Sequence, residues 1–286
     1  MMDKRTRLAE IFQDTQQFYN SNPTLIESVN VSKVGTKLYE DGRKFDFPVN
    51  NNIKAGVVSI TKSKTYEAAI RLNKQHPDKR IAVLNFASAS RPGGGVKNGS
   101  SAQEESLCRC STLYPTLDRR VLWQQYYDVN RASGNVLHTD ACIYSPGVII
   151  FKTDTDFPER MDEKEWCKVD VISCAAPNLR NEPANQYNPE TGKAVSILPS
   201  VLQKIHEQRA RQILAVAADN MIDILVLGAF GCGAFRNDPK VVAKAYQNVL
   251  TDHRQYFDLI EFAIYCRDYE TENYDTFQKI FGITTL

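Results

Sequence analysis

Short apolar runs of strand length, separated by stretches with helical spacing, are the feature of this sequence that most restricts its fold. Residues 56–61 and 80–86 have the pattern of strands, and residues 64–73 between them have the pattern of a helix. Further strands are expected at residues 141–151, 167–175, 222–227 and 259–266, and further helices at 6–19, 103–113, 120–130, 197–218, 239–250 and 274–281. Alternation of this kind predicts a three-layer α/β/α domain with a largely parallel central sheet.

Length and composition favour a globular protein with a substantial core. The chain has 286 residues, of which 42% are hydrophobic and 24% charged, enough to bury a core without disulfides. Its seven cysteines are an odd number and several lie inside apolar runs, so we expect reduced, mostly buried thiols. The apolar runs are shorter than a membrane-spanning helix, and no secretory signal is readable, so a cytoplasmic location is expected.

Charge and histidine spacing restrict the ligands. A net charge of +1 lacks the basic excess typical of duplex-binding proteins, so no sequence-specific nucleic-acid binding is expected. The four histidines have no partner spacing typical of zinc, and no metal or cofactor is expected. An anionic ligand would therefore depend on local backbone donors.

The first candidate ligand loop is the glycine-rich segment 91–107, RPGGGVKNGSSAQEESL, which follows the strand expected at 80–86. Ligands of open α/β sheets bind beyond the carboxyl ends of strands. Three consecutive glycines, which let the backbone approach a ligand closely, stand in this loop: Gly93, Gly94 and Gly95.

Two glutamates open the helix that follows this loop. Ser101 and Glu104 have the spacing of a capping box, which gives Glu104 a structural interpretation. On a helix, the side chain of Glu105 points roughly 100° away from that of Glu104. It has the simpler interpretation of a first-turn acid that complements the helix dipole, but its place beside the triple glycine favours a role in catalysis.

The second candidate loop is GAFGCGAFRND, residues 228–238, between an expected strand and an expected helix. Glycines at 228, 231 and 233 leave backbone N–H groups free to converge on an anion. The segment fits neither the dinucleotide fingerprint nor the P-loop. Asn237 or Asp238 is expected to cap the next helix, with Pro239 in its first position.

Both loops and the segments around them resemble the bacterial-type poly(ADP-ribose) glycohydrolases, which are macrodomains with a helical N-terminal extension. The signature of that family is a triple glycine, a short variable stretch and Gln-Glu-Glu, matched here by Gly93 to Gly95, VKNGSSA and Gln103-Glu104-Glu105. The resemblance extends through the segments VLNFASASRPGGG, SLCRCSTLYP, IYSPGVIIF, CAAPN and GAFGCGAFRND. It implies a macrodomain-like mixed sheet, with residues 1–50 as an accessory extension and residues 51–286 as the catalytic domain.

The resemblance also implies roles for individual residues. Glu105 corresponds to the catalytic acid and base, and Glu104 to a neighbour that holds the ribose on the leaving side. Phe235 would pack on the ribose that is cleaved. Other residues that the resemblance assigns to substrate binding are Asn85 at the distal ribose, Gln103, the triple glycine along the diphosphate, and Gly228, Phe230, Gly231, Cys232, Gly233 and Ala234 around the diphosphate. Adenine contacts are not assigned, although the vicinity of Tyr265 is a candidate.

The implied mechanism agrees with glycoside chemistry. Adjacent residues on one helix do not straddle a bond as the two carboxylates of ordinary glycosidases do. A single carboxylate is therefore expected to protonate the leaving oxygen and later to deprotonate the attacking water. Glu105 would then need a partly desolvated site to be protonated near neutral pH.

Three alternatives remain open on the sequence alone. The same loops could belong to a non-catalytic ADP-ribose reader, to a mono(ADP-ribosyl) hydrolase that acts on protein or nucleic acid, or to an unrelated nucleotide-binding protein. The near-neutral charge offers no extended basic groove for a polyanion, which favours cleavage from the end of a poly(ADP-ribose) chain.

Overall fold

A single mixed sheet of seven strands organises the computed structural model, which describes residues 3–43, 56–184 and 192–282. The strand order is β1-β4-β5-β3-β6-β7-β2. The strands are β1 (Lys37–Tyr39), β2 (Val57–Thr61), β3 (Ile81–Phe86), β4 (Cys142–Ile150), β5 (Cys167–Cys174), β6 (Ile224–Leu227) and β7 (Leu259–Ala263). Neighbouring strands from β5 to β2 pair in parallel, whereas β4 is antiparallel to both β5 and β1. The predicted mixed, largely parallel sheet is confirmed.

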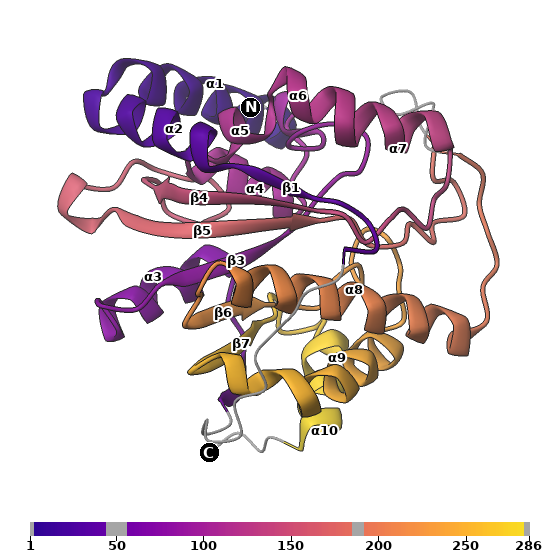
Figure 1. Ribbon diagram of the computed structural model, residues 1–286. Helices are drawn as coiled ribbons and strands as arrows, with labels where there is room; N and C mark the ends of the chain where they lie inside the picture. Colours follow the sequence, from indigo (N-terminus) through magenta and orange to yellow (C-terminus); the bar gives the residue numbers. More distant parts are fainter. Residues whose placement is uncertain (1–2, 44–55, 185–191, 283–286) are drawn as a thin grey trace.

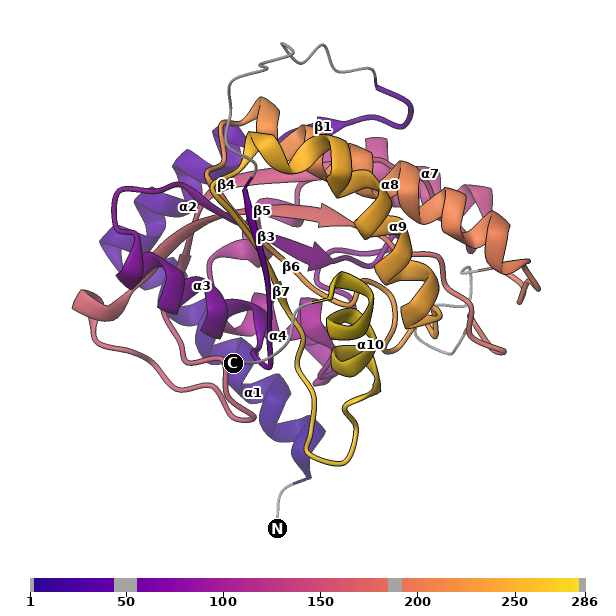
Figure 2. The same ribbon diagram turned by 90° about the horizontal axis from the view of Figure 1, so that it is seen from below.

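Helices cover both faces of this sheet. They are α1 (Lys4–Ser21), α2 (Pro23–Gly35), α3 (Thr65–Gln75), α4 (Gln103–Cys110), α5 (Leu113–Leu117), α6 (Arg120–Leu122), α7 (Asp128–Ser133), α8 (Pro199–Asp219), α9 (Pro239–His253) and α10 (Glu272–Phe281). In Figure 1, α1 and α2 lie along β4 on one side, and α8, α9 and α10 gather on the other. Figure 2 shows β3, β6 and β7 side by side between the two helix layers. The three-layer prediction is therefore confirmed.

The central strands bury both of their faces, which explains their continuously apolar sequences. Successive side chains of β3 enter opposite cores: Val83 belongs to the cluster with α3, α4 and α5, and Leu84 to the cluster with α8, α9 and α10. Both side chains are fully buried. The sheet is thus fixed between two cores, and its carboxyl-end loops share a rigid support.

The N-terminal segment packs into the first of these cores. Phe12 of α1 is buried, and its ring lies 5.0 Å from that of Tyr114, centroid to centroid. The buried Lys152 ammonium donates to the Ile11 carbonyl over 3.0 Å and pairs with Asp14 over 2.7 Å. These contacts hold α1 on the body of the protein. The expected boundary between the extension and the catalytic domain, at residues 50 and 51, lies outside the described residues.

Some elements differ from the sequence-based expectation. The patterns did not predict α2 or β1, although Asn22 caps α2 and Pro23 occupies its first turn. The helix expected at 103–113 divides at Ser111, because Ser111 bridges to Ile150 and the Thr112 amide donates to the Ile149 carbonyl over 3.0 Å. The helix expected at 120–130 forms as α6, a π-helical turn over Trp123–Tyr127, and α7. Other differences are shifts of one to three residues at the ends of elements.

The cysteines, the possible metal ligands and the hydrophobicity of the helices also bear on the expectations from the sequence. All seven cysteines are free, and five of them are buried, as the sequence predicted. Within residues 3–43, 56–184 and 192–282, no group of three or more His, Cys, Asp or Glu side chains is arranged to hold a metal ion. No helix in these same ranges is both long and apolar enough to cross a membrane.

We expect Phe12→Ala to lower the free energy of unfolding by about 3–5 kcal/mol, because it removes a buried ring from the shared core. Urea denaturation measures this value. Val31→Ala is the matched control, since Val31 is 62% exposed on α2 and its truncation should change stability by less than about 0.5 kcal/mol. A loss of under about 1 kcal/mol for Phe12→Ala would show that α1 is an appendage that the core does not need.

Candidate active site

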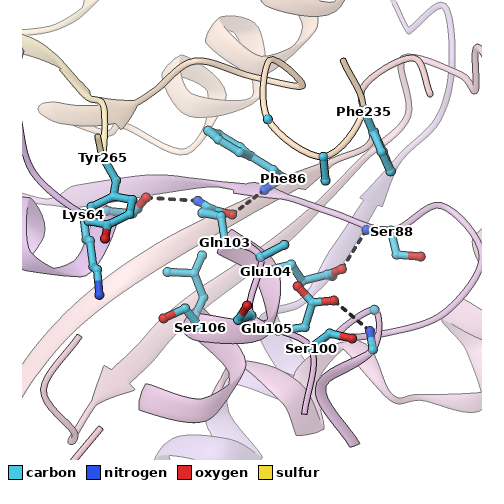
Figure 3. Close-up of a pocket in the computed structure, with 18 of the residues that line it drawn as sticks. Lys64, Phe86, Ser88, Ser100, Gln103, Glu104, Glu105, Ser106, Phe235 and Tyr265 are labelled. Carbon is cyan, nitrogen blue, oxygen red and sulfur yellow. Dashed lines mark hydrogen bonds between the residues drawn. The ribbon is translucent and has the colours of Figure 1, made fainter. Parts of the chain in front are cut away.

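A cavity of about 780 Å³ opens at the carboxyl ends of the central strands. Phe86 at the end of β3, Ala229 after β6 and Ala263 at the end of β7 all line it. Its volume suits a ligand of nucleotide size. Figure 3 shows Tyr265 and Lys64 at one end, Phe235 and Ser88 at the other, and the two glutamates near the Phe235 end.

The triple glycine brings the backbone against both glutamates. The Gly95 amide donates to Oε1 of Glu105 over 2.8 Å. Gly94 has a left-handed φ of 52°, and a Cβ there would lie 2.6 Å from Oε1 of Glu105 and 3.1 Å from Oε2 of Glu104. Gly93 is also left-handed, and its Cβ would lie 2.8 Å from the Tyr114 ring. Because a side chain at position 94 would clash with both carboxyl groups, the loop requires glycine there.

Gln103 fastens the start of α4 to the end of β3. Its Nε2 donates to Leu84 O over 2.8 Å and to Thr65 Oγ1 over 3.0 Å, and its Oε1 accepts from the Phe86 amide over 2.8 Å (Figure 3). Gln103 lines the cavity, but these bonds already occupy its amide. Its main effect is to fix where the helix begins.

The capping box predicted for this helix is wrong. The residue before the first helical turn is Ala102, and no side chain caps it. Glu104 turns away from Ser101: its Oε2 accepts from the Ser88 amide over 2.7 Å and its Oε1 from Asn85 Nδ2 over 3.3 Å. The helix begins one residue later than a capping box requires, so Glu104 is free to face β3.

Glu104 is a carboxyl group that holds a proton at neutral pH. It is 3% exposed. Burial, and after it the charge of Glu105, raises the pKa of Glu104 to about 8, although the bonds from Ser88 and Asn85 act to lower it. Asn85 also donates to Ser173 over 3.0 Å and is fully buried. Asn85 does not line the cavity and contacts the site through Glu104.

Glu105 lies between the glycine loop and a buried arginine. It is 8% exposed and lines the cavity. Arg109, one helical turn further along α4, is 2% exposed and also lines the cavity. In the part of the chain that the structure describes, its Nε and Nη2 have no hydrogen-bond partner. Burial lowers the pKa of Arg109, and the charge of Glu105 opposes that shift, so this arginine contributes positive charge to the site.

The second glycine loop is shaped by Asn237. Nδ2 of Asn237 donates to Pro177 O over 2.7 Å and to Gly231 O over 3.0 Å. Gly231 has a φ of 80°, and a Cβ there would lie 2.7 Å from Asn237 Nδ2. His206 Nε2 lies 2.9 Å from Oδ1 of Asn237, and burial lowers the pKa of His206 to about 4, so this imidazole is neutral. Asp238, not Asn237, caps α9.

Only part of the second loop faces the cavity. The residues of this loop that line it are Ala229, Gly231, Gly233, Ala234 and Phe235. Phe230 is fully buried, with its ring centroid 5.5 Å from that of Phe86. Gly228, Phe230 and Cys232, which the resemblance assigned to substrate binding, do not line the cavity, and neither does Gly93. Phe230 instead supports the loop through its contact with Phe86.

Phe235 is flanked by two side chains that the sequence analysis did not identify. The guanidinium carbon of Arg180 lies 5.6 Å from the ring centroid, and the His138 ring lies 6.3 Å away. Burial, with the charge of Arg209, lowers the pKa of His138 to about 3, so it is neutral. No motif surrounds Arg180 or His138, and only the fold brings them to Phe235.

The opposite end of the cavity carries an exposed aromatic side chain. Tyr265 is 53% exposed, and the Lys64 ammonium lies 5.1 Å from its ring centroid. Both residues line the cavity (Figure 3). An exposed ring beside a cation is a surface on which a nucleobase can stack.

Comparison with known proteins identifies the family. The model of the microbial-type poly(ADP-ribose) glycohydrolase (PARG) catalytic domain matches residues 9–153, just over half of the chain, including both glutamates. The chain belongs to the microbial-type PARG family. No curated protein sequence matches it.

Solved structures of bacterial members of the PARG family share the fold. The poly(ADP-ribose) glycohydrolase of Thermomonospora curvata is 27% identical with a TM-score of 0.79, over 96% of this chain and 100% of that one. The enzyme of Deinococcus radiodurans, in complex with ADP-ribose, is 32% identical with a TM-score of 0.71, over 89% of this chain and 96% of that one. The T. curvata enzyme bound to the inhibitor ADP-HPD matches with a TM-score of 0.77 and 27% identity, over 96% of this chain and 99% of that one.

We expect Gly94→Ala to lower kcat/KM for poly(ADP-ribose) about 100-fold or more, because the new Cβ would displace both carboxyl groups. Gly134→Ala is the matched control: Gly134 has a similar φ of 57°, and its Cβ would meet nothing within 4 Å. Both variants carry the strain of a left-handed alanine, and only the first should lose activity. Equal activity of the two variants would contradict the close approach at position 94.

We expect Glu104→Gln to stabilise the protein at high pH only. The pKa of Glu104 is raised from 4.5 to about 8 on folding, so its favourable contribution is complete below pH 4.5 and is lost as the pH rises through 8. Urea denaturation should show the variant gaining up to about 5 kcal/mol on the wild type between pH 4.5 and pH 9. A pH-independent difference between the two proteins would mean that Glu104 does not titrate in this way.

Proposed function

We propose that this chain hydrolyses the ribose–ribose O-glycosidic bonds of poly(ADP-ribose) and releases ADP-ribose. The observation that carries the proposal is that Glu105 and the loop bearing Phe235 face the same cavity. Membership of the microbial-type PARG family supports it, and so does similarity to bacterial enzymes whose structures hold ADP-ribose or ADP-HPD.

The cavity suggests one orientation of ADP-ribose. The adenine stacks near Tyr265, the diphosphate lies against the backbone amides of Gly231, Gly233 and Ala234, and the distal ribose packs under Phe235. This order places the anomeric carbon beside Glu105, because Phe235 and the glutamates share one end of the cavity (Figure 3). Backbone amides suit a protein of net charge +1 that binds a diphosphate.

The two glutamates have different roles in the proposed reaction. Glu105 donates a proton to the glycosidic oxygen as the bond from the anomeric carbon breaks, and the Gly95 amide keeps its carboxyl group in place. The resulting oxocarbenium ion is attacked by water, which gives its proton back to Glu105. Glu104, protonated at neutral pH by its raised pKa, hydrogen-bonds a hydroxyl of the ribose on the leaving side. The products are ADP-ribose and a chain shortened by one unit.

The surroundings of the cavity favour cleavage at a chain end. Lys4 of α1 lines the cavity and lies 3.9 Å from Asp156, which in turn lies 3.6 Å from Lys64. These side chains border one side of the cavity, and their position there favours binding of one terminal unit over the middle of a polymer. The free thiols of all seven cysteines support a cytoplasmic location for the enzyme.

We expect Glu105→Gln to lower kcat on poly(ADP-ribose) about 100- to 10,000-fold, because the amide neither donates nor accepts the catalytic proton. ADP-ribose binding, measured by calorimetry, should persist within a few-fold. Glu10→Gln, at an exposed position on α1, is the control and should retain full activity.

Released ADP-ribose should be measured on poly(ADP-ribosyl)ated and mono(ADP-ribosyl)ated protein side by side. Loss of polymer with a resistant protein-linked unit is the expected result. Release of the protein-linked unit with intact polymer would establish a mono(ADP-ribosyl) hydrolase instead. Binding of ADP-ribose without release from either substrate would establish a non-catalytic reader.

A further inference from the structure

Two arginines that the proposed reaction does not use, Arg180 and Arg236, belong to segments that meet at Phe235. The Leu179 amide donates to the Phe235 carbonyl over 2.9 Å. Arg180 follows Leu179 and Arg236 follows Phe235, so this hydrogen bond brings the two arginines close together. The pKa of Arg180 is lowered by burial and by the charge of Arg236, in keeping with this proximity.

Arg180 is held in a fixed orientation at the cavity wall. Its Nε donates to Asn178 Oδ1 over 3.0 Å and its Nη2 to the Pro183 carbonyl over 2.8 Å. Its guanidinium lies over the Phe235 ring, and the residue lines the cavity. Both acceptors are neutral, so the positive charge of Arg180 is positioned without being compensated.

The structure shows no acidic partner for these two charges in the part of the chain that it describes. Among residues 3–43, 56–184 and 192–282, no carboxylate forms an ion pair with Arg180 or Arg236. Arg236 is exposed and has a left-handed φ of 57°. The charge of Arg236 acts on Arg180, and a bound dianion would reduce the repulsion between the two arginines.

We propose that Arg180 and Arg236 form a subsite for the diphosphate of the ADP-ribose unit on the leaving side of the scissile bond. The inference rests on the proposed function. That diphosphate is attached to the ribose that carries the leaving oxygen, so it lies one sugar away from the bond beside Phe235. Guanidinium groups bind phosphate oxygens through paired N–H donors. A single ADP-ribose on a protein side chain has no second diphosphate, so the subsite selects polymer.

The test compares two substrates that share the anomeric carbon and differ in the leaving group. One is an ADP-ribose dimer, and the other is an aryl glycoside of ADP-ribose, whose leaving group has no phosphate. In the double variant R180Q/R236Q, the ratio of kcat/KM for the dimer to that for the aryl glycoside should fall about 10- to 30-fold, mainly through KM for the dimer. The salt dependence of kcat/KM for the dimer should also become shallower.

The control is the double variant K168Q/K279Q, which removes the same charge at two exposed positions that do not line the cavity. Its substrate ratio should match that of the wild type. A ratio that stays within twofold in R180Q/R236Q overturns the subsite, while cleavage of the dimer by the wild type leaves the proposed function intact. A wild-type protein that cleaves neither substrate overturns both.

Discussion

The hydrogen bond from the Gly95 amide to Glu105, at 2.8 Å, is the contact on which the rest of the site depends. It forms only because residue 94 has no side chain, since a Cβ would lie 2.6 Å from the same carboxyl oxygen. The contact fixes the first turn of α4 against the loop that follows β3. Gln103 also joins the start of α4 to the end of β3, because its side chain accepts a hydrogen bond from the Phe86 amide. The carboxyl group of Glu105 is therefore positioned by backbone before any ligand binds, which is the preorganisation that catalysis requires.

Two adjacent glutamates on one helix acquire different properties because they face different surroundings. Glu104 faces β3, where burial and the neighbouring charge raise its pKa to about 8. Glu105 faces the cavity and lies one turn from the buried guanidinium of Arg109. Glu104 can therefore donate a hydrogen bond at neutral pH, whereas Glu105 lies in the cavity where the proposed reaction takes place. Different surroundings are how enzymes give two carboxyl groups different roles.

Much of the architecture could be predicted from the sequence because it depends on local patterns. The buried strands β3, β6 and β7 are short apolar runs, and the glycine loops lie directly after β3 and β6. The glycine-loop motifs also predicted part of the candidate site, since Glu105 and Phe235 line one cavity.

Contacts between distant segments could not be predicted in this way. Glu104 has the spacing of a capping residue, yet it bonds to Ser88 and Asn85 because β3 passes beside α4. Phe230 lies in a glycine-rich loop that was expected to bind the ligand, yet its ring packs against Phe86 and is fully buried. Arg180 carries no motif, and only the pairing of Leu179 with the Phe235 carbonyl brings it to the site. Residue types and spacing do not encode such contacts, because they arise when the sheet brings its carboxyl-end loops together.

The most direct measurement of the central claim is a crystal structure of the Glu105→Gln variant with an ADP-ribose dimer bound. The account predicts that the side-chain amide of residue 105 lies within about 3 Å of the oxygen that joins the two riboses, with the diphosphate of the terminal unit against the amides of residues 231 to 234. A dimer bound with that oxygen far from position 105, or with its diphosphate outside the second glycine loop, would contradict the account.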